Sequence, residues 1–326
     1  MTSDNKKQPP AASGVRQQWT DMPQKIRDLI EDYLGSTVVT TETQSGGFSP
    51  GVAARLYTAD ERCFFLKAMG TDLNSSSVNF HRKEIKINKA FPTNSVAPKL
   101  LWSYDDAEDT EWVALLFDNV DGENPATPWQ NNDLQRVMIA LGELSDVLTP
   151  SPIQSLPSAS DYFSQRINGW QRIQSGAALI KVDQLDDWSK RHLDALCERE
   201  KKAPDAVAGH TLVHFDIRAD NIVMNDDVWF VDWPHACIGA KWLDVVAFAP
   251  SVAMQSDVLP DTFIQQHPAC RDADPEEITA AVISIAGMLT HNGLLPAPAG
   301  LPTLRAFQAA QAEVARQWVA KRTGWQ

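Results

Sequence analysis

The sequence has few cysteines and no long apolar run, and both shortages narrow the classes of protein it can encode. Cys63, Cys197, Cys237 and Cys270 lie far apart, so neither a CxxC pair nor a zinc-ligand spacing is present. No apolar run reaches the roughly 18 residues of a membrane-spanning helix, and the longest, residues 280–289, is typical of a buried helix. The polar N-terminus lacks the apolar stretch of a signal peptide. These absences predict a cytoplasmic protein with no membrane partner.

Positive charge is also in short supply. Lysine and arginine total 29 against 42 acidic residues, so the formal net charge is −13. Such a surplus repels nucleic acid, which is therefore not an expected partner. An acidic surface is compatible with a cationic ligand, but a solvated surface explains it equally well. The same two interpretations apply to an acidic group in a helical region: Asp183, Asp186, Asp187 and Glu198.

A chain of 326 residues is long enough for two lobes that share a cleft. The first third of the chain is predicted to form a β-rich lobe. Residues 1–14 are polar and contain proline and glycine, which predicts a disordered tail. Helical spacing of apolar residues predicts helices over residues 15–34 and 77–91. Strand signals occur at residues 37–43, 52–58, 63–69, 99–104 and 111–120. The predicted N-terminal lobe, residues 15–122, is thus a five-stranded antiparallel sheet with one inserted helix.

The rest of the chain, residues 123–326, reads as a mainly helical C-terminal lobe. Pro125 and Pro128 mark the linker that precedes it. Helices are predicted over residues 133–148, 159–175, 184–202 and 304–322, and short apolar segments over residues 210–213 and 228–231. The predicted fold class is therefore α+β, with two lobes.

The strongest chemical signal is the pattern HxDxxxxN, which His214, Asp216 and Asn221 satisfy, followed by Asp232 at the end of an apolar segment. Phosphoryl transfer needs metal ions on the phosphates and a carboxylate that orients the attacking hydroxyl. Asp216 is the candidate for that carboxylate, and Asn221 and Asp232 are the candidate ligands of Mg²⁺. A chance Asp and Asn in a loop is the alternative, but the flanking apolar segments and Asp232 favour catalysis.

A glycine-rich turn lies between the first two predicted strands. It contains Gly46, Gly47, Phe48, Ser49 and Gly51. Glycine allows the backbone to approach a phosphate closely, and backbone N–H groups can bind phosphate oxygens. A plain hairpin turn has the same composition. The turn matches neither the Walker pattern nor GxGxxG.

Lys67 interrupts an otherwise apolar strand and, if it faces inward, needs an anionic partner. In kinases that partner is a phosphate pair together with a helix glutamate, for which Glu84 is the candidate. The alternatives are a surface lysine and an exposed helix glutamate. Further on, a strand runs into the linker, where backbone groups of Asp118 and Val120 could pair with an adenine edge, unless this is an ordinary strand end.

These motifs together resemble the aminoglycoside phosphotransferase family, which has the protein-kinase-like fold. The resemblance extends from about Gln18 to the C-terminus and is most specific over residues 212–252. The sequence is similar to an actinobacterial-type subgroup, many of whose members have no assigned substrate. The resemblance implies ATP or GTP and Mg²⁺ as cofactors.

The resemblance also implies roles for individual residues. Asp216 is the catalytic base or the group that orients the acceptor hydroxyl, with His214 and Asp244 holding its loop. Asn221 and Asp232 bind magnesium. On the nucleotide side, Lys67 contacts the α- and β-phosphates and pairs with Glu84, residues 46–51 cover the phosphates, and Phe117 to Val120 form the hinge.

The sequence departs from the family pattern at Phe215, where glycine is usual, and at Arg218, where histidine or lysine is frequent. Arg218 either contacts the γ-phosphate bidentately or pairs with Asp220 or Asp244. Only a short segment separates Asp232 from Asp244, and no APE motif follows. A protein-kinase activation segment does not fit there, which favours a small-molecule acceptor over a protein.

The expected function is transfer of the ATP or GTP γ-phosphate to a hydroxyl of a small molecule, by a monomer or homodimer. The candidate acceptors are an aminoglycoside, another antibiotic or a sugar-like metabolite, and the first two imply a role in antibiotic resistance. The alternative is a nucleotide-binding or sensing protein with degenerate catalysis. Phe215 alone invites that alternative, whereas Lys67, Asp216, Asn221 and Asp232 form an intact set.

Overall fold

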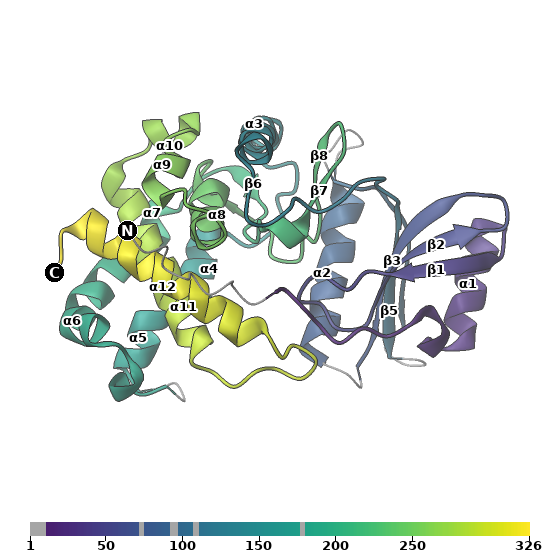
Figure 1. Cartoon of the computed structure of the whole chain (residues 1–326), viewed down its shortest axis with the longest axis horizontal. Coiled ribbons are helices and arrows are strands. Elements are labelled where there is room, and N and C mark those ends of the chain that lie inside the picture. The colour runs from purple at the N-terminus through teal and green to yellow at the C-terminus, as the bar shows by residue number, and fades with distance from the viewer. Residues whose placement is uncertain (1–10, 72–74, 92–96, 107–110, 177–179) are drawn as a thin grey trace, which may run out of the picture.

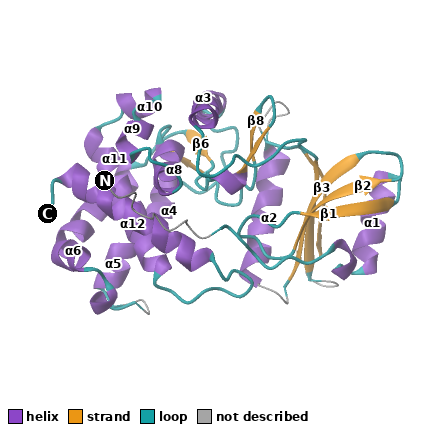
Figure 2. Cartoon of the chain, viewed as in Figure 1, coloured by secondary structure: helices purple, strands orange, loops and turns teal. Residues whose placement is uncertain are grey.

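Two lobes lie end to end in the computed structural model, which describes residues 11–71, 75–91, 97–106, 111–176 and 180–326 (Figure 1). The strands of the large sheet gather in one lobe, whereas helices fill the other (Figure 2). This arrangement confirms the predicted two-lobed α+β fold.

One antiparallel sheet forms the core of the N-terminal lobe. Its strands follow the order β1-β2-β3-β5-β4. In chain order they are β1 (Val38–Thr43), β2 (Val52–Thr58), β3 (Cys63–Gly70), β4 (Leu100–Asp106) and β5 (Trp112–Asp118). All five lie where the sequence predicts strands.

Successive side chains along each strand point to opposite faces of the sheet. One helix packs on each of these faces. On β3, Leu66 packs in one apolar cluster with residues of α1 (Gln24–Leu34). Its neighbour Phe65 packs in another cluster with residues of α2 (Ser75–Ala90). Helix α2 lies on the face that looks toward the C-terminal lobe (Figure 1), so a residue of β3 on that face, such as Lys67, is directed toward the cleft between the lobes.

The predicted helix over residues 15–34 is wrong in its first half. Only a short 3₁₀ turn, Trp19–Asp21, precedes Pro23, and α1 begins after it. Proline disfavours helical geometry in the residue before it, and Met22 is extended, with ψ 149°. Residues 1–10 of the predicted disordered tail lie outside the described residues. Beyond them the chain runs extended beside the glycine turn, where Ser13 forms a bridge with Gly46.

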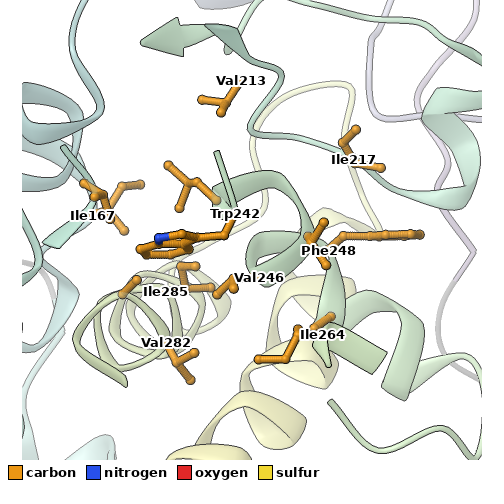
Figure 3. Close-up of a cluster of buried hydrophobic side chains, with 14 of the residues drawn as sticks. Ile167, Val213, Ile217, Trp242, Val246, Phe248, Ile264, Val282 and Ile285 are labelled. Carbon is orange, nitrogen blue, oxygen red and sulfur yellow. The ribbon is translucent and has the colours of Figure 1, made fainter. Parts of the chain in front are cut away.

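The C-terminal lobe is built around one long buried helix, α11 (Pro275–Gly293). Its other main helices are α3 (Asn131–Val147), α4 (Ala159–Arg166), α5 (Gly169–Gln174), α6 (Asp187–Glu200), α8 (Leu243–Met254) and α12 (Leu304–Thr323). Three helices of four or five residues complete it: α7 (Ala203–Ala206), α9 (Pro260–Ile264) and α10 (Pro268–Asp272). Figure 3 shows how Val282 and Ile285 of α11 meet Trp242 and Val246 in the core. Ile217 of the motif loop belongs to this cluster and anchors the loop.

The single helix predicted over residues 159–175 is two helices in the structure. The chain leaves helical geometry at Asn168, where ψ is 46°, and α5 turns onto α11. A Cβ atom on Gly169 would lie only 2.0 Å from the carbonyl oxygen of Gly287, so glycine alone permits this approach. Such a long-range contact leaves no periodic signal in the sequence.

Two small two-stranded sheets hold the motif residues beside the cleft. Strand β6 (Thr211–Val213) pairs with β9 (Cys237–Gly239), and β7 (Ile222–Met224) pairs with β8 (Val228–Phe230). The motif loop joins β6 to β7, and Asp232 follows β8. The sequence prediction missed β9, which has only three residues and no alternation. Within the described ranges, no helix is both long and apolar enough to cross a lipid bilayer.

Candidate active site

Lys67 joins the two lobes at the base of the cleft. Its Nζ lies 2.7 Å from Oε1 of Glu84 on α2 and 2.9 Å from Oδ1 of Asp232. Burial acts to lower the pKa of Lys67, but the charges of Asp232 and Glu84 outweigh it and raise that pKa well above its usual value. Burial would raise the pKa of Asp232, but Lys67 lowers it below the ordinary range. A lysine cation and an Asp232 carboxylate are therefore both present at neutral pH.

The motif loop is held by His214 and Asp244. Asp244 accepts hydrogen bonds from the backbone N–H groups of His214 at 2.9 Å and Phe215 at 2.7 Å. The His214 ring spans 2.9 Å from Nε2 to the carbonyl of Val231, and its Nδ1 accepts the N–H of Asp216 at 3.2 Å. These contacts confirm that both residues support the loop, and through Val231 they connect it to Asp232.

Two residues beside the motif carboxylate have left-handed backbone, Phe215 with φ 64° and Asp232 with φ 71°. For a residue other than glycine this costs about 1–2 kcal/mol. The Phe215 ring offsets part of that cost by packing 5.6 Å, between centroids, from the rings of both Tyr162 and Phe163. A left-handed φ also explains why glycine suits this position in similar sequences.

Asp216 is surrounded by polar partners from its own loop. Arg218 donates to its Oδ1, and Asn221 donates through Nδ2 to its backbone carbonyl at 2.7 Å and its Oδ2 at 3.2 Å. Arg218 also binds Asp220 bidentately, from Nε at 3.0 Å and from Nη2 at 2.8 Å. The structure therefore shows the predicted pairing of Arg218 with Asp220, and adds one with Asp216 that the sequence did not suggest.

The glycine turn adopts conformations that require glycine at two positions. Gly47 and Gly51 have φ 86° and 98°, and a Cβ atom on Gly51 would lie 2.6 Å from the carbonyl of Ala68. Arg16 lies within reach of the turn: its guanidinium donates to the carbonyls of Gln44 (at 2.8 Å), Gly46 and Ser49. The sequence prediction missed Arg16, since a single cation in a polar segment looks like any solvated arginine.

Two cavities meet at this turn. The larger, about 160 Å³, is lined by the predicted phosphate-side residues and by the hinge: Gly46, Gly47, Phe48, Ser49, Lys67, Glu84, Phe117, Asp118, Val120, Asn221 and Asp232. Arg16 also lines it, whereas the predicted Gly51 does not. The smaller cavity, about 110 Å³, is lined by Asp216 and Arg218. Phe48 lines both cavities, and the Arg218 guanidinium lies 5.4 Å from its ring centroid.

The linker between the lobes is fixed to the β7–β8 hairpin. Glu123 and Met224 exchange backbone hydrogen bonds of 3.1 and 2.8 Å, and Arg55 donates to the carbonyl of Gly122 at 2.9 Å. The N–H of Asp118 is already bonded to the carbonyl of Lys99 at 3.0 Å. The N–H of Asp118 is therefore already occupied and is not available to a nucleotide base.

The donor atoms in the larger cavity suit a magnesium–nucleotide complex better than a protein-bound metal. Asn221 donates through its Nδ2 and Asp232 accepts Lys67 on Oδ1, which leaves Oδ1 of Asn221 and Oδ2 of Asp232 for a cation. Mg²⁺ usually takes one or two carboxylate ligands together with phosphate oxygens and water. Nowhere in the described ranges do three or more His, Cys, Asp or Glu residues gather as metal ligands.

In a comparison with protein families, the model of the phosphotransferase enzyme family matches residues 46–277. This span includes the glycine turn, Lys67, the HxDxxxxN motif and Asp232. No curated protein matches the chain.

Solved structures confirm the predicted protein-kinase-like fold. A thermostable mutant of aminoglycoside phosphotransferase APH(4)-Ia superposes with a TM-score of 0.59 at 14% identity, covering 90% of this chain and 99% of that one. Choline kinase LicA from Streptococcus pneumoniae gives 0.59 at 14% identity, with 90% and 98% covered. Spectinomycin phosphotransferase APH(9)-Ia, in complex with ADP and spectinomycin, gives 0.57 at 12% identity, with 92% and 99% covered.

Proposed function

The chain belongs to the phosphotransferase enzyme family, and from this membership we propose that it transfers the γ-phosphate of ATP to a hydroxyl group of a small molecule. The observation that carries the proposal is that two cavities share Phe48 of the glycine turn as a lining residue. Lys67 and Asp232 line one of them and Asp216 lines the other. A phosphate bound in the first would reach an acceptor held in the second.

The larger cavity suits a nucleotide. Val52 and Phe65 of the sheet face Val223 and Val231 of the C-terminal lobe as apolar walls on which a base can pack. The carbonyl of Asp118 and the N–H of Val120, which bonds to no described residue, would pair with the edge of adenine. GTP would fit between the same apolar walls. Because guanine presents different hydrogen-bonding groups at its edge, the affinities measured for ATP and GTP distinguish the two nucleotides.

At the phosphates, the charges of the cleft serve binding and positioning. Lys67 would contact the α- and β-phosphates, while Glu84 holds its ammonium group in place. Asn221 and Asp232 would hold Mg²⁺, which when bound neutralises charge on the β- and γ-phosphates. Gly46 to Ser49 would cover the phosphates, with Arg16 holding the turn's carbonyls.

The transfer step assigns Asp216 to the acceptor. The acceptor oxygen attacks the γ-phosphorus, the bond from that phosphorus to the β–γ bridging oxygen breaks, and the hydroxyl proton passes to the Asp216 carboxylate. Asn221 orients this carboxylate at 3.2 Å. Arg218, held by Asp220, would move from Asp216 to the transferring phosphoryl group as charge develops there.

The proposed acceptors are an aminoglycoside, another antibiotic or a sugar-like metabolite, with antibiotic resistance as the role in the first two cases. A protein acceptor is disfavoured because only a short segment separates Asp232 from Asp244, and part of that segment, β9, pairs with β6. A cytoplasmic location and a monomeric or homodimeric state remain predictions.

A phosphorylation screen tests the proposal. The protein with Mg·ATP is offered aminoglycosides, other antibiotics and sugar alcohols, and products are detected by mass spectrometry as the mass of one added phosphoryl group. We expect at least one phosphorylated acceptor with wild-type protein and none with Asp216→Ala. Tight Mg·ATP binding without product from any acceptor would instead support a nucleotide sensor.

A further inference from the structure

The smaller cavity has an apolar wall opposite Asp216. Helix α11 contributes Ile285 and Leu289, and α12 contributes Leu304 and Phe307. Phe48 of the glycine turn closes one side, with its ring 5.1 Å from that of Phe307 in an edge-to-face arrangement. A volume of about 110 Å³ far exceeds the roughly 10–15 Å³ that one water molecule needs, so the cavity has room for part of an organic molecule.

The cavity carries no net charge. Among the residues that line it, only Asp216 and Arg218 are charged, and they are paired with each other. A ligand with several ammonium groups needs carboxylates, because burying an unpaired cation is costly. Neither α11 nor α12 contributes an acidic side chain to the lining.

The acidic residues of the helical region do not supply the missing charge. Asp186 caps α6 by accepting from the N–H of Ser189 at 2.9 Å, and it pairs with Arg316 at 3.1 Å. Glu198 pairs with Lys201, and Asp183 and Asp187 are exposed. None of the four lines either cavity. The structure therefore does not support the interpretation that this acidic group binds ammonium groups of the acceptor.

One polar side chain in the lining has no partner. Gln311 of α12 is only 7% exposed, yet its amide forms no hydrogen bond with any described residue. The amide atoms keep some accessible surface, so a ligand in the cavity can bond to them. The amide offers both a donor and an acceptor, the combination that a hydroxyl group satisfies.

We propose that the acceptor is an uncharged alcohol with an apolar carbon skeleton and at least two hydroxyl groups. One hydroxyl faces Asp216 and receives the phosphoryl group, and another pairs with the amide of Gln311. This inference rests on the proposed phosphotransferase activity and selects among its candidate acceptors. It disfavours polycationic aminoglycosides in favour of neutral compounds.

Matched acceptors test the inference. Cyclohexanediols and butyl glucoside are compared with counterparts in which one hydroxyl is replaced by an amino group, using kcat/KM with Mg·ATP. We expect the uncharged member of each pair to be preferred by tenfold or more. The Gln311→Glu variant places a carboxylate of similar shape in the cavity, which can pair with an ammonium group. The ratio of kcat/KM values within each pair should then shift toward the ammonium member by at least tenfold, while the KM for ATP stays unchanged. Gln317→Glu, on the exposed side of α12, is the control and should change neither.

Acceptor binding to the complex with Mg·ADP, measured by ligand-detected NMR on the same pairs, provides a readout that does not depend on turnover. Preferential binding of the uncharged members, weakened in Gln311→Leu, supports the inference even if catalysis is slow. Preferential phosphorylation or binding of the ammonium members by wild type would overturn the inference and leave the phosphotransferase proposal intact. Selective binding of the uncharged members with no phosphoryl transfer to any compound would overturn the phosphotransferase proposal instead.

Discussion

Asp216 is held in the cleft indirectly, through contacts made by the two residues that precede it in the loop. The loop is pinned by Asp244 through two backbone N–H groups and by His214 through Val231. Phe215 accepts a left-handed φ of 64° because its ring finds an aromatic pocket. A bulky residue at this position is therefore compatible with an ordered loop around Asp216, so Phe215 does not by itself favour the sensor hypothesis.

Arg16 offers a test of how the glycine turn is held. Replacing it with alanine removes three hydrogen bonds to the turn's carbonyls, so the turn should become mobile and bind phosphates less well. We expect the KM for ATP to rise by about tenfold, equivalent to about 1.4 kcal/mol, with a smaller change in the acceptor KM. Steady-state kinetics measures both. Arg62→Ala, at the opposite end of β2, is the control, and an equal effect there would remove the assignment.

At the scale of elements, the β-branched and apolar runs between turns are strong enough to predict every strand of the large sheet, and the motif spacing is strong enough to predict the loop residues. What the sequence could not show depends on contacts between distant segments. Arg16 binds carbonyls about 30 residues away, Gly169 approaches Gly287 across the helical lobe, and Gln311 reaches the cavity from the last helix. None of these contacts leaves a local pattern.

The contact of α5 with α6 contains a buried acid that makes stability depend on pH. Glu200, 1% exposed, accepts the N–H groups of Trp170 at 3.2 Å and Gln171 at 2.9 Å. Burial raises its pKa to about 7, despite these bonds. Because the folded state favours the protonated form, the stabilisation is complete below the unfolded pKa and is lost as pH rises through about 7.

Glu200→Gln, which does not titrate, should therefore gain stability relative to wild type as pH rises. If the unfolded chain keeps the ordinary glutamate pKa of 4.5, the relative gain between pH 4.5 and 8 should approach about 3 kcal/mol. Urea unfolding at several pH values measures it. The exposed Glu198→Gln on the same helix should show little pH-dependent difference, and parallel stability curves for wild type and Glu200→Gln would contradict the account.

At the scale of the whole molecule, several contacts besides the Lys67–Asp232 ion pair hold the lobes around the cleft. The linker is bonded to β7, the N–H of Val15 donates to the carbonyl of Gly300 at 2.8 Å, and Phe48 packs on Phe307. The excess of acidic residues, which gives the chain a net charge of −13, does not line the smaller cavity. The charged residues of that cavity are one aspartate and one arginine. Overall acidity is therefore a poor guide to the acceptor.

A ligand that bridges the lobes should stabilise the entire chain. Mg·ATP at 100 times its Kd should add about 2.7 kcal/mol to the free energy of unfolding, seen as a higher Tm in scanning fluorimetry. In Asp232→Ala the part of this shift that needs magnesium should disappear, because one of its two proposed ligands is lost. Asp226→Ala, exposed in the β7–β8 turn, should behave like wild type. An undiminished magnesium effect in Asp232→Ala would remove Asp232 from the metal site.

The central claim is that Asp216 acts on the acceptor and not on the nucleotide. The most direct measurement compares Asp216→Asn with wild type in single-turnover phosphoryl transfer to the best acceptor from the screen, together with the Kd for Mg·ATP. The account predicts a rate lower by about 10²–10⁴-fold with nucleotide affinity near wild type. A variant that transfers phosphate at close to the wild-type rate, or that loses nucleotide binding in proportion to its rate, would contradict it.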